Sequence, residues 1–102
     1  MTGFIHHFSW DPEKALVNHN KHGVNFEVAA TVLNDPLALS RYDEEHSEAE
    51  ERWVTLGLAA GGALLVVVHT FEELNPHEAA VRIISARPAT PAERRDYENP
   101  VG

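Results

Sequence analysis

The run of apolar and β-branched residues at positions 64–71 constrains the fold of this chain more than any other segment. Such residues favour strands, and an unbroken apolar run is typical of a strand in the middle of a sheet. Its apolar core, residues 63–68, is far shorter than the roughly 20 residues of a membrane-spanning helix. Residues 52–58 and 81–87 also predict strands, and we expect the three to be antiparallel neighbours.

Helix signals precede and follow these strands. Asp11-Pro12-Glu13 predicts a helix start and Gly23 a left-handed end, which gives a helix over Pro12–His22. The same rules predict a strand over 4–10 before this helix and a second helix after it, which Asn25 caps and Asp35-Pro36 ends. A short edge strand is expected within 36–42, and loops are expected over 43–51 and 72–78. The capping box Thr90-Pro91-Ala92-Glu93 begins a last helix that reaches Glu98.

A chain of 102 residues is long enough for one domain of this kind and too short for two. We therefore expect a single α+β domain over residues 1–102, with helices packed on one face of an antiparallel β-sheet. The other face of the sheet is then partly open, and a functional site is expected there. The first seven residues lack the basic flank and long apolar stretch of a signal peptide, which favours an intracellular protein.

The charge is distributed unevenly. Eight Lys and Arg residues oppose sixteen Asp and Glu residues, and the net charge of −8 argues against general binding to nucleic acid phosphates. Six of the acids lie in residues 43–51, and without them the net charge is −2. Residues 82–95 hold four arginines and one acid, so a local basic surface is compatible with this acidic chain. The alternative is a solvated acidic loop with ordinary surface arginines.

Several kinds of catalytic site are excluded or poorly supported. The chain has no cysteine, which excludes disulfides, thiolate zinc sites and cysteine catalysis. His19 and His22 share a face of the first expected helix, but a metal site there would need Glu13 or a further histidine. The sequence has no HExxH motif, serine nucleophile elbow or glycine-rich phosphate loop. We expect no metal and no cofactor, and a small histidine-based metalloprotein remains the alternative.

Metal-free cleavage of RNA is the chemistry that the basic residues can support. The ribose 2′-hydroxyl is the nucleophile, so the protein need only position the phosphodiester, move protons and stabilise the charged transition state. Arginine forks and a histidine suffice for these tasks. Arg52, His69, Arg82 and Arg87 lie on the three expected strands, and they converge if those strands are neighbours.

Three of these assignments have alternatives. Arg82 and Arg87 lie on opposite faces of a regular strand, so one of them must be at a frayed or bulged end or be structural. His69 can instead be a core histidine bonded to a backbone carbonyl. Trp10 and Trp53 can stack on bases, although tryptophans in such positions more often fill the core.

The sequence resembles the BrnT family of bacterial toxins in its motifs and in their spacing. The matching blocks are Phe8-Ser9-Trp10-Asp11, Lys14, Asn18, Lys21-His22-Gly23-Val24, Phe26-Glu27, Glu51-Arg52, Leu56-Gly57, Val66-Val67-Val68-His69-Thr70, Arg82-Ile83-Ile84-Ser85-Ala86-Arg87-Pro88-Ala89-Thr90, Glu93-Arg94 and Tyr97. These blocks cover residues 8–98. The Lys-His-Gly and Ile-Ser-Ala-Arg blocks, in this order and at this spacing, make the resemblance specific.

The resemblance implies a ribonuclease toxin of a type II toxin–antitoxin pair with a RelE-like fold, acting in the bacterial cytoplasm. It also implies a BrnA-like antitoxin with a ribbon-helix-helix part, through which alone the pair would contact operator DNA. The residues that fall in matching blocks and are the best functional candidates are Trp10, Lys21, His22, Arg52, Arg87 and Arg94. The departure from RelE-like toxins is the acidity of this chain, since those toxins are usually basic.

We therefore expect a metal-independent endoribonuclease. Arg52 and Arg87 are expected to stabilise the phosphorane, and His69 or His22 to transfer protons. Trp10, Lys21, Arg82 and Arg94 are the expected substrate-binding residues, with Lys21 and Arg94 on flanking phosphates. The alternative from a different class is a non-catalytic module that binds another protein through its sheet face and acidic loop.

Overall fold

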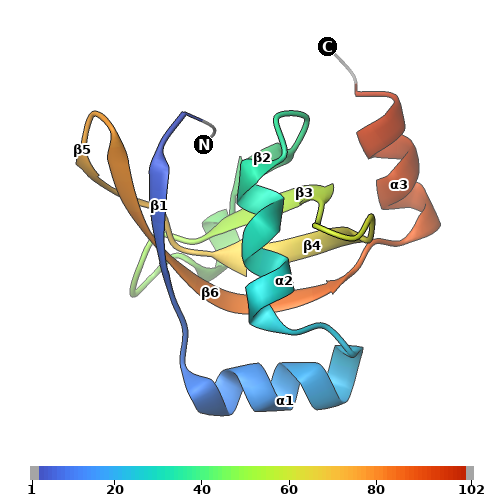
Figure 1. The fold of residues 1–102 in the computed structure, drawn as a ribbon, viewed down its shortest axis with the longest axis horizontal. Helices are drawn as coiled ribbons and strands as arrows, with labels where there is room; N and C mark the ends of the chain where they lie inside the picture. Colours follow the sequence, from blue (N-terminus) through green and yellow to red (C-terminus); the bar gives the residue numbers. More distant parts are fainter. Residues whose placement is uncertain (1–2, 101–102) are drawn as a thin grey trace.

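The computed structural model describes residues 3–100, which form an α+β fold on one six-stranded sheet (Figure 1). The strands are β1 (Ile5–Ser9), β2 (Leu39–Tyr42), β3 (Trp53–Leu58), β4 (Leu64–His69), β5 (Glu72–Asn75) and β6 (Glu78–Pro88). The helices are α1 (Pro12–His22), α2 (Phe26–Ala30) and α3 (Pro91–Glu98), with short 3-10 helices η1 (Thr31–Asn34) and η2 (Glu44–His46). No helix within residues 3–100 is long and apolar enough to cross a membrane.

The strands expected around residues 52–58, 64–71 and 81–87 are neighbours and antiparallel, as predicted. The sheet order is β1-β6-β4-β3-β2, so the apolar strand β4 lies between β3 and β6. Five of its six residues are buried, which accounts for its composition. The edge strand β2 is exposed along its whole length and pairs only with β3 within the described residues.

Two features of the sheet differ from the sequence-based expectation. β1 runs parallel to β6, so the sheet is mixed rather than antiparallel. Residues 72–78, expected to be a loop, form β5 and a tight turn into β6. Asn75-Pro76 predicted the loop, but the Asn75 side chain accepts the His77 N–H at 2.8 Å and closes a hairpin turn instead. Pairing with β6 thus overrides the weak strand preference of Glu72 and Glu73.

The core lies between the sheet and the segment formed by α2 and η1. In Figure 1, α2 crosses in front of the sheet, while α1 lies beyond the edge of β6 and α3 lies beyond its end. The buried side chains include Phe26, Ala29, Val32 and Leu33 from the helical segment and Leu65, Val67, Val81, Ile83 and Ala86 from the sheet. Trp10 packs against this core with its ring edge-on to Phe26, at 6.1 Å between ring centroids.

The first helix is bounded by the signals that predicted it, and a buried side chain attaches it to the sheet. The Asp11 side chain accepts the Glu13 N–H, and Gly23 ends α1 with a φ of 71°. Asn18 is buried at 6% exposure and pairs with both backbone groups of Ala86 on β6, at 2.9 and 3.0 Å. The pairing of β1 with β6 ends at Arg82. Further along that edge of β6, the Asn18 side chain supplies the hydrogen bonds that a neighbouring strand would supply.

A β-bulge in β6 decides which side chains share a face. Val68 lies opposite Ser85 and His69 lies opposite Ile83, so Ile84 is an extra residue on β6. Before the bulge the buried residues are at odd positions up to Ile83, and after it the next buried residue is Ala86. Arg82 and Arg87 therefore share the face away from α2, which is the bulged arrangement that the sequence left open.

His69 lies on the opposite, helix-covered face and is fully buried. Its Nδ1 donates to the Thr70 carbonyl oxygen at 2.8 Å, and its Nε2 accepts from the Thr55 hydroxyl at 2.7 Å. The expectation that His69 joins the arginines is therefore not met, and the core-histidine alternative describes it. Burial lowers the pKa of His69 from 6.5 to about 4.

Asn18→Ala is expected to lower the free energy of unfolding by about 2–4 kcal/mol, because two backbone groups of Ala86 lose their partner inside the protein. Asn20→Ala on the same helix is the control, since Asn20 is exposed, and it should change stability by less than about 0.5 kcal/mol. Urea denaturation measures both. Equal stability of the two variants would contradict the role given to Asn18.

His69→Gln is expected to flatten the dependence of stability on acid. The folded-state pKa lies below the unfolded value, so the unfolded chain takes up a proton first as the pH falls. The contribution of neutral His69 to the free energy of unfolding is complete above about pH 6.5 and is lost as the pH falls toward 4. Between pH 7 and pH 4 the wild type should lose roughly 3 kcal/mol more than the variant. Parallel curves for the two proteins would show that His69 does not titrate in this way.

Candidate functional site

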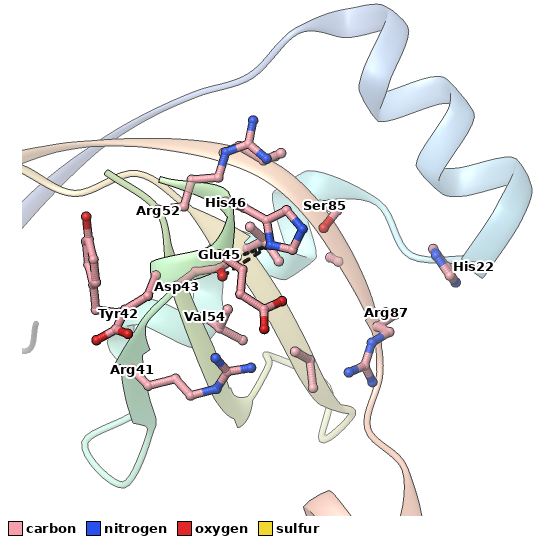
Figure 2. A pocket seen from close by; sticks show the side chains of 15 residues that line it. His22, Arg41, Tyr42, Asp43, Glu45, His46, Arg52, Val54, Ser85 and Arg87 are labelled. Atoms are coloured by element: carbon pink, nitrogen blue, oxygen red, sulfur yellow. Dashed lines mark hydrogen bonds and ion pairs between the residues drawn. The ribbon is translucent and has the colours of Figure 1, made fainter. Parts of the chain in front are cut away.

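The sheet face away from α2 carries a cavity of about 620 Å³. We call this face the open face; Val54, Val66, Val68 and Ser85 lie on it. The charged and polar residues that line the cavity are His22, Arg41, Tyr42, Asp43, Glu44, Glu45, His46, Arg52, Ser85 and Arg87. We call it the arginine cavity, because three arginines from three different segments line it (Figure 2).

Sheet register places the three arginines. Arg41 on β2 pairs with Val54 on β3, and both therefore lie on the open face. Arg52 directly precedes β3, and Arg87 reaches the same face because of the bulge in β6. In Figure 2 the side chains of Arg41 and Arg87 extend toward the middle of the cavity from two sides, and Arg52 lies at a third. Three cationic forks around one cavity form a site for an anion with several oxygens.

Arg87 is held by a carboxylate of α3. Its Nη1 and Nη2 donate to the two oxygens of Glu93 at 2.7 and 2.8 Å. Glu93 also accepts the Thr90 N–H at 2.8 Å, completing the capping box that the sequence predicted. The hydrogen bonds from Arg87 lower the pKa of Glu93 to about 2, so the pair is ionised at neutral pH. The position of Arg87 is thus fixed by the helix that follows β6.

Glu50 lies near two arginines, Arg82 on β6 and Arg52 just before β3. It accepts a hydrogen bond from Arg82 and lies 3.8 Å from Nη2 of Arg52. Within residues 3–100 the Arg52 Nε is enclosed without a hydrogen-bond partner, and Arg41 forms no ion pair. The acidic segment 43–51 therefore lies against the basic site and does not project away from it. Arg41 and Arg52 are the cations of the cavity least committed to a carboxylate.

A second hollow of about 400 Å³ continues along α1. Its charged lining is mixed, with Lys14 and Lys21 beside Asp11 and Glu13. It shares His22, Ile84 and Ser85 with the arginine cavity, so His22, the last residue of α1, lies between the two hollows. The end of α1 favours a positive charge because the helix carbonyl groups point toward it.

The structure brings together only part of the predicted site. His22, Arg52 and Arg87 line the arginine cavity, and Lys21 lines the adjoining hollow. Arg82 lies beyond Glu50, outside the cavity lining. Three predicted residues lie elsewhere: His69 is in the core, Trp10 packs against Phe26, and Arg94 is exposed on α3 outside the residues that line the cavity.

Arg41, His46 and Ser85 line the cavity but were not predicted. Alternation along the expected edge strand, combined with its register against Val54, would have found Arg41. Ser85 depends on the bulge, and His46 on the folding of the acidic segment over the sheet, and no local pattern indicates either of these. No cluster of three or more His, Asp or Glu side chains within residues 3–100 is arranged to hold a metal ion.

Comparisons with known proteins agree with this fold. The family model described as "Ribonuclease toxin, BrnT, of type II toxin-antitoxin system" matches residues 10–93. The crystal structure of the ribonuclease toxin BrnT from Brucella abortus is similar in fold, with a TM-score of 0.53 and 24% sequence identity. The alignment covers 81% of this chain and 95% of that one. Comparison with curated protein sequences gave no significant match.

The family match includes the first helix, the central strands, the bulged strand β6 and the start of α3, which are the segments that supply His22, Arg52 and Arg87. The chain belongs to the BrnT family of ribonuclease toxins of type II toxin–antitoxin systems.

Proposed function

We propose that this protein is a metal-independent endoribonuclease and that the arginine cavity is its active site. The observation that carries the proposal is the meeting of Arg52, Arg87 and His22 around one solvent-open cavity. A phosphodiester under attack by its own 2′-hydroxyl gains negative charge on its oxygens, and preorganised arginine donors stabilise that charge. The RNA supplies the nucleophile, so no metal-activated water is needed.

The residues predicted from the sequence have separate tasks in this reaction. Arg52 and Arg87 stabilise the phosphorane, with Arg87 oriented by Glu93. His22, at the positive-charge-favouring end of α1, transfers a proton to the leaving 5′-oxygen. Lys21 holds a flanking phosphate in the adjoining hollow, and Arg94, which is exposed on α3, is assigned a more distant one.

The carboxylates at the site set the conditions for RNA binding. A phosphate that binds Arg52 must compete with Glu50, and the net charge of the chain is −8. The long-range electrostatic attraction of RNA to the protein is therefore weak, and binding becomes favourable only when the phosphate contacts the arginines directly. His69 and Trp10 take no part in this proposal, because both pack into the core.

The family implies an antitoxin partner, and we propose that it is a BrnA-like protein with a ribbon-helix-helix part. Operator DNA is then contacted through the antitoxin, because the toxin is too acidic to bind DNA phosphates generally. An RNA substrate places the activity in the bacterial cytoplasm. The open face of a mainly antiparallel sheet, with α2 and η1 packed on the other face, supports a RelE-like classification.

Arg52→Ala and Arg87→Ala are each expected to lower RNA cleavage about 10²–10³-fold in kcat, the typical effect of removing one transition-state donor. The same variants should relieve the growth arrest that expression of the wild type causes. Arg95→Ala is the matched control: Arg95 is exposed on α3 outside the cavity and should leave both readouts unchanged. Cleavage of bulk RNA in EDTA and growth after induction measure these outcomes at equal protein levels.

The same assay separates the alternatives. Activity that survives chelation supports the proposal, whereas loss that zinc restores would support a metalloprotein. An absence of cleavage at every enzyme concentration would favour a non-catalytic binding module. Full toxicity in both arginine variants would remove the arginine cavity from the mechanism.

A further inference from the structure

A second histidine lies in the arginine cavity, and the mechanism above gives it no task. His46 is the last residue of η2, within the acidic segment 43–51, and it lines the cavity together with His22. Its side chain is 63% exposed, so it is accessible to a substrate. Figure 2 shows the His46 ring above the cavity, between Arg52 and Glu45, while His22 lies at the side formed by the end of α1. The two histidines thus reach the cavity from different segments.

Asp43 orients the imidazole of His46. Nδ1 of His46 lies 3.1 and 3.2 Å from the two carboxylate oxygens of Asp43, whose side chain is only 13% exposed. A carboxylate accepts hydrogen bonds, so Nδ1 carries a proton and donates a hydrogen bond to Asp43. The lone pair of the neutral ring is then on Nε2, at the far side of the ring from Asp43. A histidine held in this tautomer can accept a proton, and the carboxylate stabilises the imidazolium that forms.

The backbone ties this pair to Arg52. The Asp43 N–H donates to the Arg52 carbonyl oxygen at 2.8 Å, and the Arg52 N–H donates to the Ser47 hydroxyl oxygen at 3.0 Å. The Ser47 hydroxyl in turn donates to the Asp43 carbonyl oxygen. These hydrogen bonds attach the first turn of the acidic segment to Arg52, the residue that precedes β3. Arg52 and the Asp43–His46 pair are therefore linked through the backbone and the Ser47 hydroxyl.

We propose that His46 is the general base of RNA cleavage and that Asp43 is its positioning residue; this rests on the proposed function. Nε2 of His46 takes the proton of a ribose 2′-hydroxyl as O2′ forms a bond to phosphorus. The P–O5′ bond breaks, and O5′ takes a proton from protonated His22. The products are a 2′,3′-cyclic phosphate and a 5′-hydroxyl, and the two histidines end with exchanged protonation states.

Imidazole is suited to this task because an unperturbed imidazole changes its charge near neutral pH. The charged and titratable groups around His46 are Asp43, Glu44 and Glu45 on its own segment, Arg41 and Tyr42 on β2, Arg52 before β3, Arg87 on β6 and His22 on α1.

The test uses two substrates that differ at one atom. One is an oligodeoxynucleotide with a single ribonucleotide, and the other replaces the 5′-bridging oxygen after that ribonucleotide by sulfur. A thiolate leaves without a proton, so the second substrate needs a base but no acid. We expect His46→Gln to lower kcat about 10²–10⁴-fold on both substrates. His22→Gln should be slow on the oxygen substrate and recover on the sulfur substrate.

Two further measurements separate a chemical role from a structural one. The rate of the wild type should fall in acid as the base becomes protonated, and this acidic limb should be absent from the pH profile of His46→Gln. Asp43→Asn should lower kcat less than His46→Gln does, with KM nearly unchanged. His77→Gln is the matched control, because His77 is exposed in the β5–β6 turn outside the cavity.

The outcomes are distinguishable. Wild-type cleavage with equal cleavage by His46→Gln overturns the assignment of the base and leaves the proposed function intact. Recovery of His46→Gln on the sulfur substrate overturns it too, since His46 would then act on the leaving group. No cleavage of either substrate by the wild type rejects the proposed function and this inference together.

Discussion

One extra residue in β6 determines the chemistry that this sheet can support. Ile84 has no partner opposite the step from Val68 to His69, and the shift turns Arg87 onto the face that Arg82 already occupies. In a regular strand these arginines would lie on opposite faces, and one of them would enter the apolar core. Asn18 binds the backbone of Ala86 just after the bulge, so the helix that supplies His22 is attached at the same point. The bulge therefore determines which β6 side chains line the cavity, and it lies next to the point where α1 is attached.

The acidity of the chain is concentrated where the cations are. Glu93 holds Arg87 in a two-point ion pair, and Glu50 contacts Arg82 and lies near Arg52. Such carboxylates fix the direction of a guanidinium but reduce its attraction for a distant phosphate. Under the proposed function, such a site favours local, oriented contact over long-range capture of RNA, which is compatible with a net charge of −8.

Local signals were sufficient to predict the helices and the central strands, because caps and apolar runs act over a few residues. Long-range pairing was not predicted: the parallel contact of β1 with β6 and the pairing of β5 depend on segments far apart in the chain. The same division holds for the site. Motifs and residue chemistry singled out His22, Arg52 and Arg87, which line the arginine cavity, whereas His69 could not be assigned to a face without the register of β4. His46 also lines the cavity but was not singled out, because the fold of the acidic segment over the sheet is a tertiary property.

In the proposed function, the arginine cavity promotes attack by the 2′-hydroxyl of RNA on its own phosphodiester. The chemical identity of the new ends tests this most directly. Mass spectrometry of fragments formed in EDTA should detect 2′,3′-cyclic phosphate, or the monophosphate derived from it, opposite a 5′-hydroxyl. Fragments that end in a 3′-hydroxyl and a 5′-phosphate would require attack by water and would contradict the account.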